Sequence, residues 1–510
     1  MNSSEKMAVN SVILYVKLLI TIAVNLIATR LILNAMGVED YGVVNLISGI
    51  VSMLTFIQNS MAVSTQRYMS VNMGKGDVQL QSKIFNNGLF LHLLLGIFIL
   101  IILEACLPLV FNSDIQIPSD RYAPSMILYQ LTCLGTFLVI ICVPVDATLN
   151  AHENMLWVSF ASILESIIRL AGAFWLLYYH NDKLIFYGLL VVVIRLTSLL
   201  FKTIYCRNKY EEVRIIKNEI SKKLMKEMFS FSLWNMFGAF AMAMRGQGVA
   251  VVLNIFNGVV VNTAYGIAQQ VSGQLHNFSG TISKSMNPQI MQREGGGNTK
   301  AMTSLALKQS YYTTLFMFFF ALPLYVEMPY VLKLWLKIVP EYSIDFCRIF
   351  LLIVFVTQMS SGLMTAIQAK GKIAAYQITL SIILLLNLPI AYLLQKIGFE
   401  PSIVLWSMLG VEGVCLTARL VAAKLLVGIS VKDFFSNVLL RLFIVVVPTI
   451  IIVVLCKSFV ILRWSPLWQL LTSIAVTITV ASIIAYLTFD KNERAIIFSF
   501  SKKIKNKYKM

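Results

Sequence analysis

The chain has 510 residues, of which 58% are hydrophobic and only 13% are charged, and its formal net charge is +18. Soluble domains carry roughly 25% charged residues, and the mean hydropathy of +0.77 indicates an integral membrane protein. Apolar stretches of about 20 residues recur from end to end, which predicts spanning helices. Polar and apolar residues do not alternate as in the strands of a transmembrane β-barrel, so that class is excluded.

The apolar segments predict an all-α polytopic protein with about 14 transmembrane helices. These helices begin near residues 8, 42, 84, 123, 155, 184, 229, 260, 311, 345, 373, 401, 439 and 467. The first segment is too long for a signal peptide, so we expect it to be the first helix. Lys and Arg gather in alternate connections, among them 70–83, 206–228, 290–310 and the tail after Asp490. This bias predicts that both termini are cytoplasmic, and it accounts for most of the positive charge without nucleic acid as a partner.

A short phrase occurs twice: Tyr41-Gly42 with Ser48-Gly49, and, 224 residues later, Tyr265-Gly266 with Ser272-Gly273. The two copies open the second and eighth predicted helices, so the period is six helices and the two halves are parallel repeats. We therefore expect an N-terminal six-helix bundle (1–206), a cytoplasmic linker (207–228), a C-terminal six-helix bundle (229–430), two further helices (431–489) and a basic tail (490–510). Mixed charged and apolar residues favour an amphipathic surface helix for 207–228, with a solvated linker as the alternative.

Charged residues inside the spans indicate where the protein encloses a polar space. Each costs about 3 kcal/mol at the bilayer centre, so it faces a cavity or a partner. The basic residues outnumber the acidic ones and predict a lumen that attracts an anion. The basic residues are Lys17, Arg30, Arg67, Arg169, Arg195, Arg245, Lys284 and Arg419; the acidic ones are Glu104, Asp146, Glu165 and Glu412.

Arg245 is the strongest candidate for a cation in the lumen. It lies mid-span between residues that loosen a helix, Gly246, Gln247 and Gly248, and no acidic residue is near it in the sequence. Lys284 is the second candidate. Arg30 and Arg67 are weaker candidates, because both lie towards the ends of their spans and could extend to lipid headgroups instead.

Two acidic residues have possible partners on their own helices. Glu165 and Arg169 are four residues apart and could neutralise each other. Glu412 and Arg419 are seven apart, on the same face two turns on, and could pair in part.

The second and eighth predicted helices are too polar to face lipid, so we expect them to form polar walls suited to a hydroxyl-rich cargo. The residues assigned to these walls, with one neighbour of Arg245, are Asn45, Gln58, Asn59, Gln247, Gln270, Gln274, His276 and Asn277. A lone histidine such as His276 is more often a hydrogen-bonding group than a proton relay.

The motifs of enzymes are missing from this sequence. Its four histidines form no metal-ligand spacing, and neither a P-loop nor a nucleophile elbow is present. The seven cysteines are scattered through apolar segments, which favours packing over disulfides or metal binding. We expect no enzymatic activity, no metal and no cofactor.

Arg30, Gly37 and Asp40-Tyr41-Gly42, followed by a long span and a glycine-containing turn, resemble the start of bacterial polysaccharide transporters. These are the O-antigen and capsule repeat-unit flippases of the multidrug/oligosaccharidyl-lipid/polysaccharide exporter superfamily. The resemblance implies a MATE-like fold in the bacterial inner membrane, with two six-helix bundles around a cavity. It also implies alternating access and a polyprenyl-diphosphate-linked oligosaccharide as the cargo, with a polysaccharide polymerase and other assembly proteins as further partners.

Two other functions remain open at the level of sequence. A drug or organic-cation exporter of the same fold, driven by protons or Na⁺, would need an essential acid within the membrane. Glu165, Glu412 and Asp146 are the candidates for such ion coupling. A scaffold of an envelope assembly complex would depend on its loops and not on Arg245.

Overall fold

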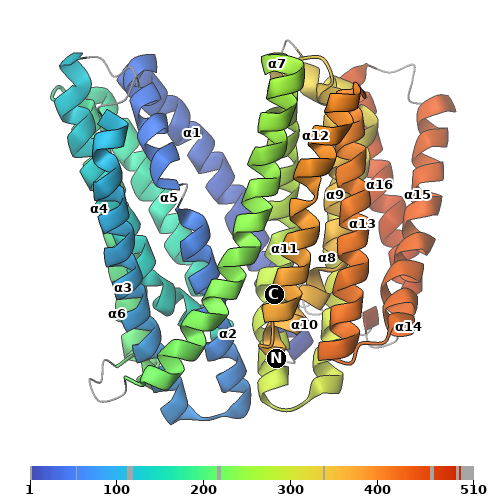
Figure 1. The fold of residues 1–510 in the computed structure, drawn as a ribbon, viewed down its shortest axis with the longest axis horizontal. Helices are drawn as coiled ribbons and strands as arrows, with labels where there is room; N and C mark the ends of the chain where they lie inside the picture. The colour runs from blue at the N-terminus through green and yellow to red at the C-terminus, as the bar shows by residue number, and fades with distance from the viewer. Residues whose placement is uncertain are drawn as a thin grey trace, which may run out of the picture. The chain divides into compact units, whose positions relative to one another are not determined.

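The computed structural model describes residues 3–52, 54–111, 119–214, 220–336, 339–459, 465–489 and 493–494. Within these ranges every regular element is a helix (Figure 1), so the predicted all-α fold is confirmed. The chain forms two compact units. The N-terminal unit comprises Val9–Met236 and Gly295–Gly297, and the C-terminal unit comprises Met1–Ala8, Phe237–Glu294 and Asn298–Met510.

The N-terminal unit consists of long helices that pack against one another. They are α1 (Ser3–Ser52), α2 (Thr55–Lys75), α3 (Val78–Phe111), α4 (Tyr122–Ala151), α5 (Met155–Tyr178) and α6 (Lys183–Lys209), with the 3₁₀ turns η1 (Ser119–Arg121) and η2 (Glu211–Val213). α4 packs against α2, α3 and α6. Its Tyr129 is fully buried and donates a hydrogen bond to the carbonyl of Leu103 at 2.6 Å, which satisfies the one polar atom of a large core side chain.

The motif around Asp40 has a structural role at one end of this unit. Arg121, at the start of α4, forms ion pairs with Asp40 at 3.0 Å and with Asp182 at 3.2 Å. Asp182 also caps α6 by accepting hydrogen bonds from the backbone N–H groups of Leu184 and Ile185. One arginine thus ties α1, α4 and the start of α6 together.

The C-terminal unit contains most of α7 (Lys222–Gly295) and the helices that follow it. These are α8 (Thr299–Leu336), α9 (Ser343–Met359), α10 (Ser361–Lys370), α11 (Ala374–Leu385), α12 (Asn387–Ile397), α13 (Pro401–Leu426), α14 (Val431–Phe434), the π-helical turn η4 (Phe435–Leu439), α15 (Leu440–Phe459) and α16 (Pro466–Thr488). Its core gathers around Tyr265, Phe346 and Phe350. α15 and α16 pack against each other and against α8 (Figure 1).

Glycines in left-handed conformations mark a repeat in the backbone. α1 is kinked at Gly37 (φ 80°) and α7 at Gly258 (φ 78°). Gly76 and Gly297, both at φ 74°, end α2 and α7, and they are separated by 221 residues, as Gly37 and Gly258 are. After each turn a side chain caps the next helix: Asp77 accepts from the N–H of Leu80, and Asn298 accepts from the N–H of Ala301.

The backbone repeat therefore differs by three residues from the 224-residue offset of the twice-occurring phrase. Tyr41 follows its kink by four residues and Tyr265 follows its kink by seven. Three residues turn an α-helix by about 300°, so the two tyrosines point in different directions relative to their kinks. Tyr265 is fully buried, whereas Tyr41 is half-buried.

The connections predicted between spans at 70–83 and 290–310 contain only short turns between longer helices. Helix α2 continues to Lys75 and α3 starts at Val78, and α7 continues to Gly295 before α8 starts at Thr299. Hydropathy detects only the apolar part of a helix, so the predicted spans end before these helices do.

Among the described residues, 11 helices are long and apolar enough to span a membrane, or 12 if the bent pair α9 and α10 counts as one span. The polar helical segments after the kinks at Gly37 and Gly258 do not meet these criteria, and they correspond to the second and eighth predicted helices. The structure is therefore compatible with 14 spans without establishing that number.

The predicted amphipathic helix at 207–228 lies partly outside the described residues, which exclude 215–219. The described part consists of the end of α6, η2 and the start of α7. The basic tail after Asp490 is described only at Glu493 and Arg494.

Candidate functional site

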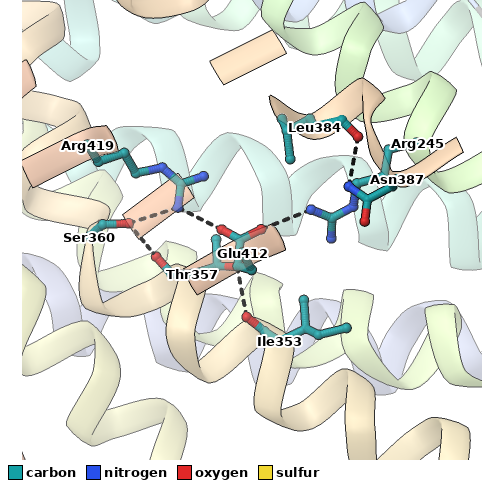
Figure 2. A network of polar contacts seen from close by, with 8 residues as sticks. All are labelled: Arg245, Ile353, Thr357, Ser360, Leu384, Asn387, Glu412 and Arg419. Carbon is teal, nitrogen blue, oxygen red and sulfur yellow. Dashed lines mark hydrogen bonds and ion pairs between the residues drawn. The ribbon is translucent and has the colours of Figure 1, made fainter. Parts of the chain in front are cut away.

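A buried ion-paired cluster lies in the C-terminal unit where α7 meets α13 (Figure 2). Arg245 Nη1 donates to Glu412 Oε2 at 2.9 Å, and Arg419 Nη1 donates to Glu412 Oε1 at 2.7 Å. The side chains of Arg245, Glu412 and Arg419 are 8%, 1% and 4% exposed. One carboxylate thus holds two guanidinium groups away from water and lipid.

The local sequence brings these residues together. Glu412 and Arg419 lie on the same face of α13, as their spacing predicted, and their partial pairing is present. Arg245 is followed by Gly246 and Gly248; a Cβ atom on Gly248 would lie 2.3 Å from Leu388 Cδ2, so this glycine permits the close packing of α7 on α12. A larger residue at position 248 would require the Leu388 side chain to move.

Breaks in the neighbouring helices supply polar partners. α9 and α10 meet at a 41° bend next to Ser360. Arg419 Nη1 donates to Ser360 Oγ at 3.1 Å, and Ser360 Oγ donates to the carbonyl of Thr357 at 2.9 Å. At the break between α11 and α12, Asn387 Nδ2 donates to the carbonyl of Leu384, and the Asn387 Oδ1 atom is buried without a partner in the described part of the chain.

The cluster carries a formal net charge of +1, since two arginines face one glutamate. Both carboxylate oxygens of Glu412 are already engaged. Arg419 Nε has no hydrogen-bond partner among the described residues, and each guanidinium has five N–H donors. An anion would neutralise the excess charge and use the remaining donors, and charge-assisted hydrogen bonds are strong in such an environment.

A polar stripe runs along α7 after its kink. Gly266, Gln270, Gly273, Asn277 and Lys284 are all exposed and recur at spacings of a helical face. The predicted wall residues Gln247, Gln274 and His276 are exposed as well. Lys284 has no acidic side chain within ion-pair distance among the described residues.

The weaker cationic candidates and the other wall residues lie in the N-terminal unit. Arg30 is exposed on α1. Arg67 is half-buried and stacks over the rings of Tyr68 and Phe231, each 4.9 Å from its guanidinium carbon. Gln58 is half-buried and Asn59 is exposed on α2, and the side chain of Asn45 lies outside the described residues. The structure thus divides the four cationic candidates between the two units.

Acidic residues of the N-terminal unit also have basic partners. Glu165 pairs with Arg195 of α6 at 3.3 Å and accepts from Ser198 Oγ at 2.5 Å, so its ion-pair partner is on the neighbouring helix and is not Arg169, the possible partner on its own helix. Asp146 pairs with Lys202 at 2.8 Å. We did not predict a role for Lys202; its charge within the apolar stretch of α6 was the available signal.

Residues 7–292 match the model of a family described as polysaccharide biosynthesis protein. The chain belongs to the polysaccharide biosynthesis protein family. The matched region contains Arg245, Lys284, Arg30 and Arg67 but ends before Glu412 and Arg419. No curated protein sequence matches this member of the family.

The fold of this family member is that of the MATE transporters. A multidrug resistance MATE transporter in an outward-facing conformation aligns with a TM-score of 0.71 at 13% identity, over 86% of this chain and 97% of that one. A transporter from Pyrococcus furiosus, whose reversed binding-pocket polarity is said to suggest a different function, aligns with a TM-score of 0.70 at 14% identity, over the same shares of the two chains. At such identities the likeness establishes the fold, and the charges must be taken from this chain.

Sequence reasoning missed the polar contacts that hold the last two helices. Glu327 of α8 pairs with Lys457 of α15 at 2.9 Å and accepts from Ser473 of α16 at 3.0 Å. Glu493 pairs with Arg441 at 3.1 Å and with Lys308 at 3.2 Å. An apolar pocket of about 310 Å³ lies between α8, α9 and α15. The single acid within α8 was the signal for the first of these contacts.

Proposed function

We propose that the protein is a flippase that moves polyprenyl-diphosphate-linked oligosaccharide repeat units across the bacterial inner membrane by alternating access. The product would serve O-antigen, capsule or exopolysaccharide biosynthesis, and both termini would be cytoplasmic. The observation that carries the proposal is the cluster of Arg245, Glu412 and Arg419, whose net positive charge lies within membrane-spanning helices of a polysaccharide biosynthesis protein.

The cluster suits the diphosphate of such a cargo. Arginine offers planar paired donors that match phosphate oxygens, and a cation within a low-dielectric region attracts an anion strongly. Glu412 would hold Arg245 and Arg419 in position while their remaining donors bind the phosphates. Because all three side chains are buried, the cargo would gain access when the helices move.

Other parts of the C-terminal unit suit the sugars and the lipid tail. The exposed stripe of α7 offers Gln270, Asn277 and Lys284 to sugar hydroxyls and acidic groups. The pocket between α8, α9 and α15 is lined by apolar side chains such as Phe318, Leu322 and Ile450. Such a lining could hold part of a polyprenyl chain while the charged head moves.

The alternative is a drug or organic-cation exporter of the same fold. That function needs an acid available to a cation within the membrane. Among the proposed coupling residues, Glu412 is held by two arginines, Glu165 by Arg195 and Ser198, and Asp146 by Lys202. These pairings favour an anionic cargo over a cationic one.

The proposal is tested by Arg245→Ala in cells that depend on this protein for surface polysaccharide. Charged hydrogen bonds contribute about 1.5–3 kcal/mol, so we expect repeat-unit translocation to fall roughly 10- to 100-fold. The amount of protein in the membrane should hold, because Glu412 retains Arg419. Lys432→Ala, which removes an exposed cation of α14, is the matched control.

Two results would count against the flippase. A normal amount of surface polysaccharide in the Arg245→Ala strain would show that the cluster is not needed to translocate the cargo. Unchanged polysaccharide combined with increased sensitivity to cationic drugs would instead favour the exporter.

A further inference from the structure

The N-terminal unit has a small polar pocket of its own between α1 and α5. Its volume is about 210 Å³, and every side chain that lines it is polar or charged. The residues are Lys17, Thr21 and Asn25 from α1, and Ser162, Glu165, Ser166 and Arg169 from α5. Both helices are apolar enough to span a membrane, where polar side chains are costly unless they face one another or a ligand.

The spacing along the two helices builds this pocket as two facing polar stripes. Lys17, Thr21 and Asn25 are four residues apart on α1, and the four residues of α5 recur at three- and four-residue steps. Such spacings place side chains on one helical face. The twice-occurring phrase and the candidates Arg245, Lys284, Arg30 and Arg67 lie outside the pocket lining, whereas Glu165, a candidate for ion coupling, is part of it.

The hydroxyl groups in the pocket are prepared to accept hydrogen bonds. Thr21 donates its proton to the carbonyl of Leu18, Ser162 to that of Val158, and Ser166 to that of Ser162. The lone pairs of these oxygens remain for outside donors. Asn25 Oδ1 is buried and has no hydrogen-bond partner in the described part of the chain. The pocket therefore offers several acceptors, which suits the O–H donors of a sugar.

The charges add a second requirement for the ligand. Among the described residues that line the pocket, two are basic, Lys17 and Arg169, and one is acidic, Glu165, which gives the lining a formal net charge of +1. Glu165 is already bound by Arg195 and by Ser198. A cation would be repelled by this surplus, whereas a carboxylate or phosphate would be attracted. The pocket combines hydrogen-bond acceptors for hydroxyl groups with neighbouring cations. A ligand that matches both is a sugar that carries an anionic group.

We infer that this pocket is a recognition site for one acidic sugar of the cargo, a uronic acid or a sugar phosphate, and that it selects acidic over neutral repeat units. The inference rests on the proposed flippase function and deepens it. The pocket is smaller than the roughly 300–1,000 Å³ of sites for drug-sized ligands, so it holds a single sugar and not the whole oligosaccharide. Lys17 and Arg169 would bind the anionic group, while Thr21, Asn25, Ser162 and Ser166 would accept from hydroxyl groups.

A binding measurement tests the pocket independently of transport. Purified full-length protein in nanodiscs is titrated with glucuronate, glucose 6-phosphate and glucose. We expect binding of at least one of the two acidic sugars and weaker binding of glucose. Lys17→Gln and Arg169→Gln should each weaken acidic-sugar binding about tenfold, and Lys75→Gln, an exposed cation of α2, should not. The arm that binds, uronate or phosphate, identifies the anionic group.

A transport measurement separates this inference from the proposed function. In proteoliposomes, wild-type protein is given lipid-linked repeat units with and without an acidic sugar. Lys17→Gln and Arg169→Gln should slow the acidic cargo about tenfold and leave the neutral cargo unchanged. Binding that is equal in wild type and both variants, or an equal slowing of both cargos, overturns the inference while the flippase stands. Wild-type protein that moves neither cargo but binds acidic sugars through Lys17 and Arg169 overturns the flippase instead.

Discussion

The two units each place cations around one acid, yet the two arrangements differ in access. In the N-terminal unit, Glu165 and its partner Arg195 are 23% and 35% exposed and adjoin an open polar pocket. In the C-terminal unit, Glu412 is 1% exposed and is enclosed by Arg245 and Arg419. A buried cluster must satisfy its charges within the protein, whereas a partly open one can share them with a ligand. Under the two proposals, the enclosed C-terminal cluster would bind the diphosphate after a movement of its helices, and the open N-terminal pocket would select the sugar.

The largest expected effect comes from removing the two acids in turn. Glu412→Gln leaves two buried arginines without a counter-charge, and breaking a buried ion pair costs about 3–5 kcal/mol. Glu165→Gln removes a partly exposed partner and should cost about 1 kcal/mol or less. Thermal unfolding of the detergent-solubilised protein measures both. If Glu412→Gln and Glu165→Gln lowered the melting temperature equally, the buried and the partly exposed acid would contribute equally to stability, and the comparison would be wrong.

A smaller effect tests whether the two units share a backbone repeat of 221 residues. Gly37 and Gly258 have φ of 80° and 78° with extended ψ, a region that is nearly restricted to glycine. Gly37→Ala and Gly258→Ala should therefore each cost about 1–3 kcal/mol. Gly42→Ala is the control, because that glycine is helical and a Cβ there meets no atom within 4 Å. If only one of Gly37→Ala and Gly258→Ala lowered the stability, the two kinks would not be equivalent positions of a repeat.

The smallest effect concerns a titratable pair outside the spans. In the N-terminal unit, His152 Nε2 lies 2.5 Å from Glu212 Oε1 and stacks on Tyr210. Burial raises the pKa of the Glu212 carboxyl, but hydrogen bonds from His152 and the backbone and the charge of His152 outweigh it and lower the pKa below 4.5. A depressed carboxyl pKa stabilises the protein above its unfolded-state value, and that stability is lost as the pH falls through the folded-state value.

In the C-terminal unit, by comparison, Lys370 and Glu294 form an ion pair at 2.7 Å that contains no histidine.

The substitution His152→Ala leaves Glu212 buried without its partner. The variant should be less stable than wild type at pH 7 and should lose less stability as the pH falls, because the folded-state pKa of Glu212 is no longer depressed by His152. Lys432→Ala should follow the wild type. Melting temperatures between pH 7 and pH 3 measure this. Superimposable curves for His152→Ala and wild type would show that the pair does not couple to folding.

The sequence predicted the class of fold because hydropathy is a local property. Apolar stretches established the all-helical membrane protein, and the spacing of Glu412 and Arg419 predicted their contact. Arg245 was selected from its position in an apolar span, and its role in binding cargo stays a prediction. The polar pocket of α1 and α5 was not predicted, although Lys17 and Arg169 were both recognised as charges within spans.

By itself, the sequence determined that this protein spans the membrane with helices, that it contains a repeat and that its spans carry more basic than acidic charge. Tertiary structure alone decided the partners of those charges. Glu412 meets Arg245 across 167 residues, and Glu165 takes Arg195 from the neighbouring helix in place of Arg169 on its own. The physical reason is that helix periodicity fixes which side chains share a face, whereas helix packing fixes which faces meet.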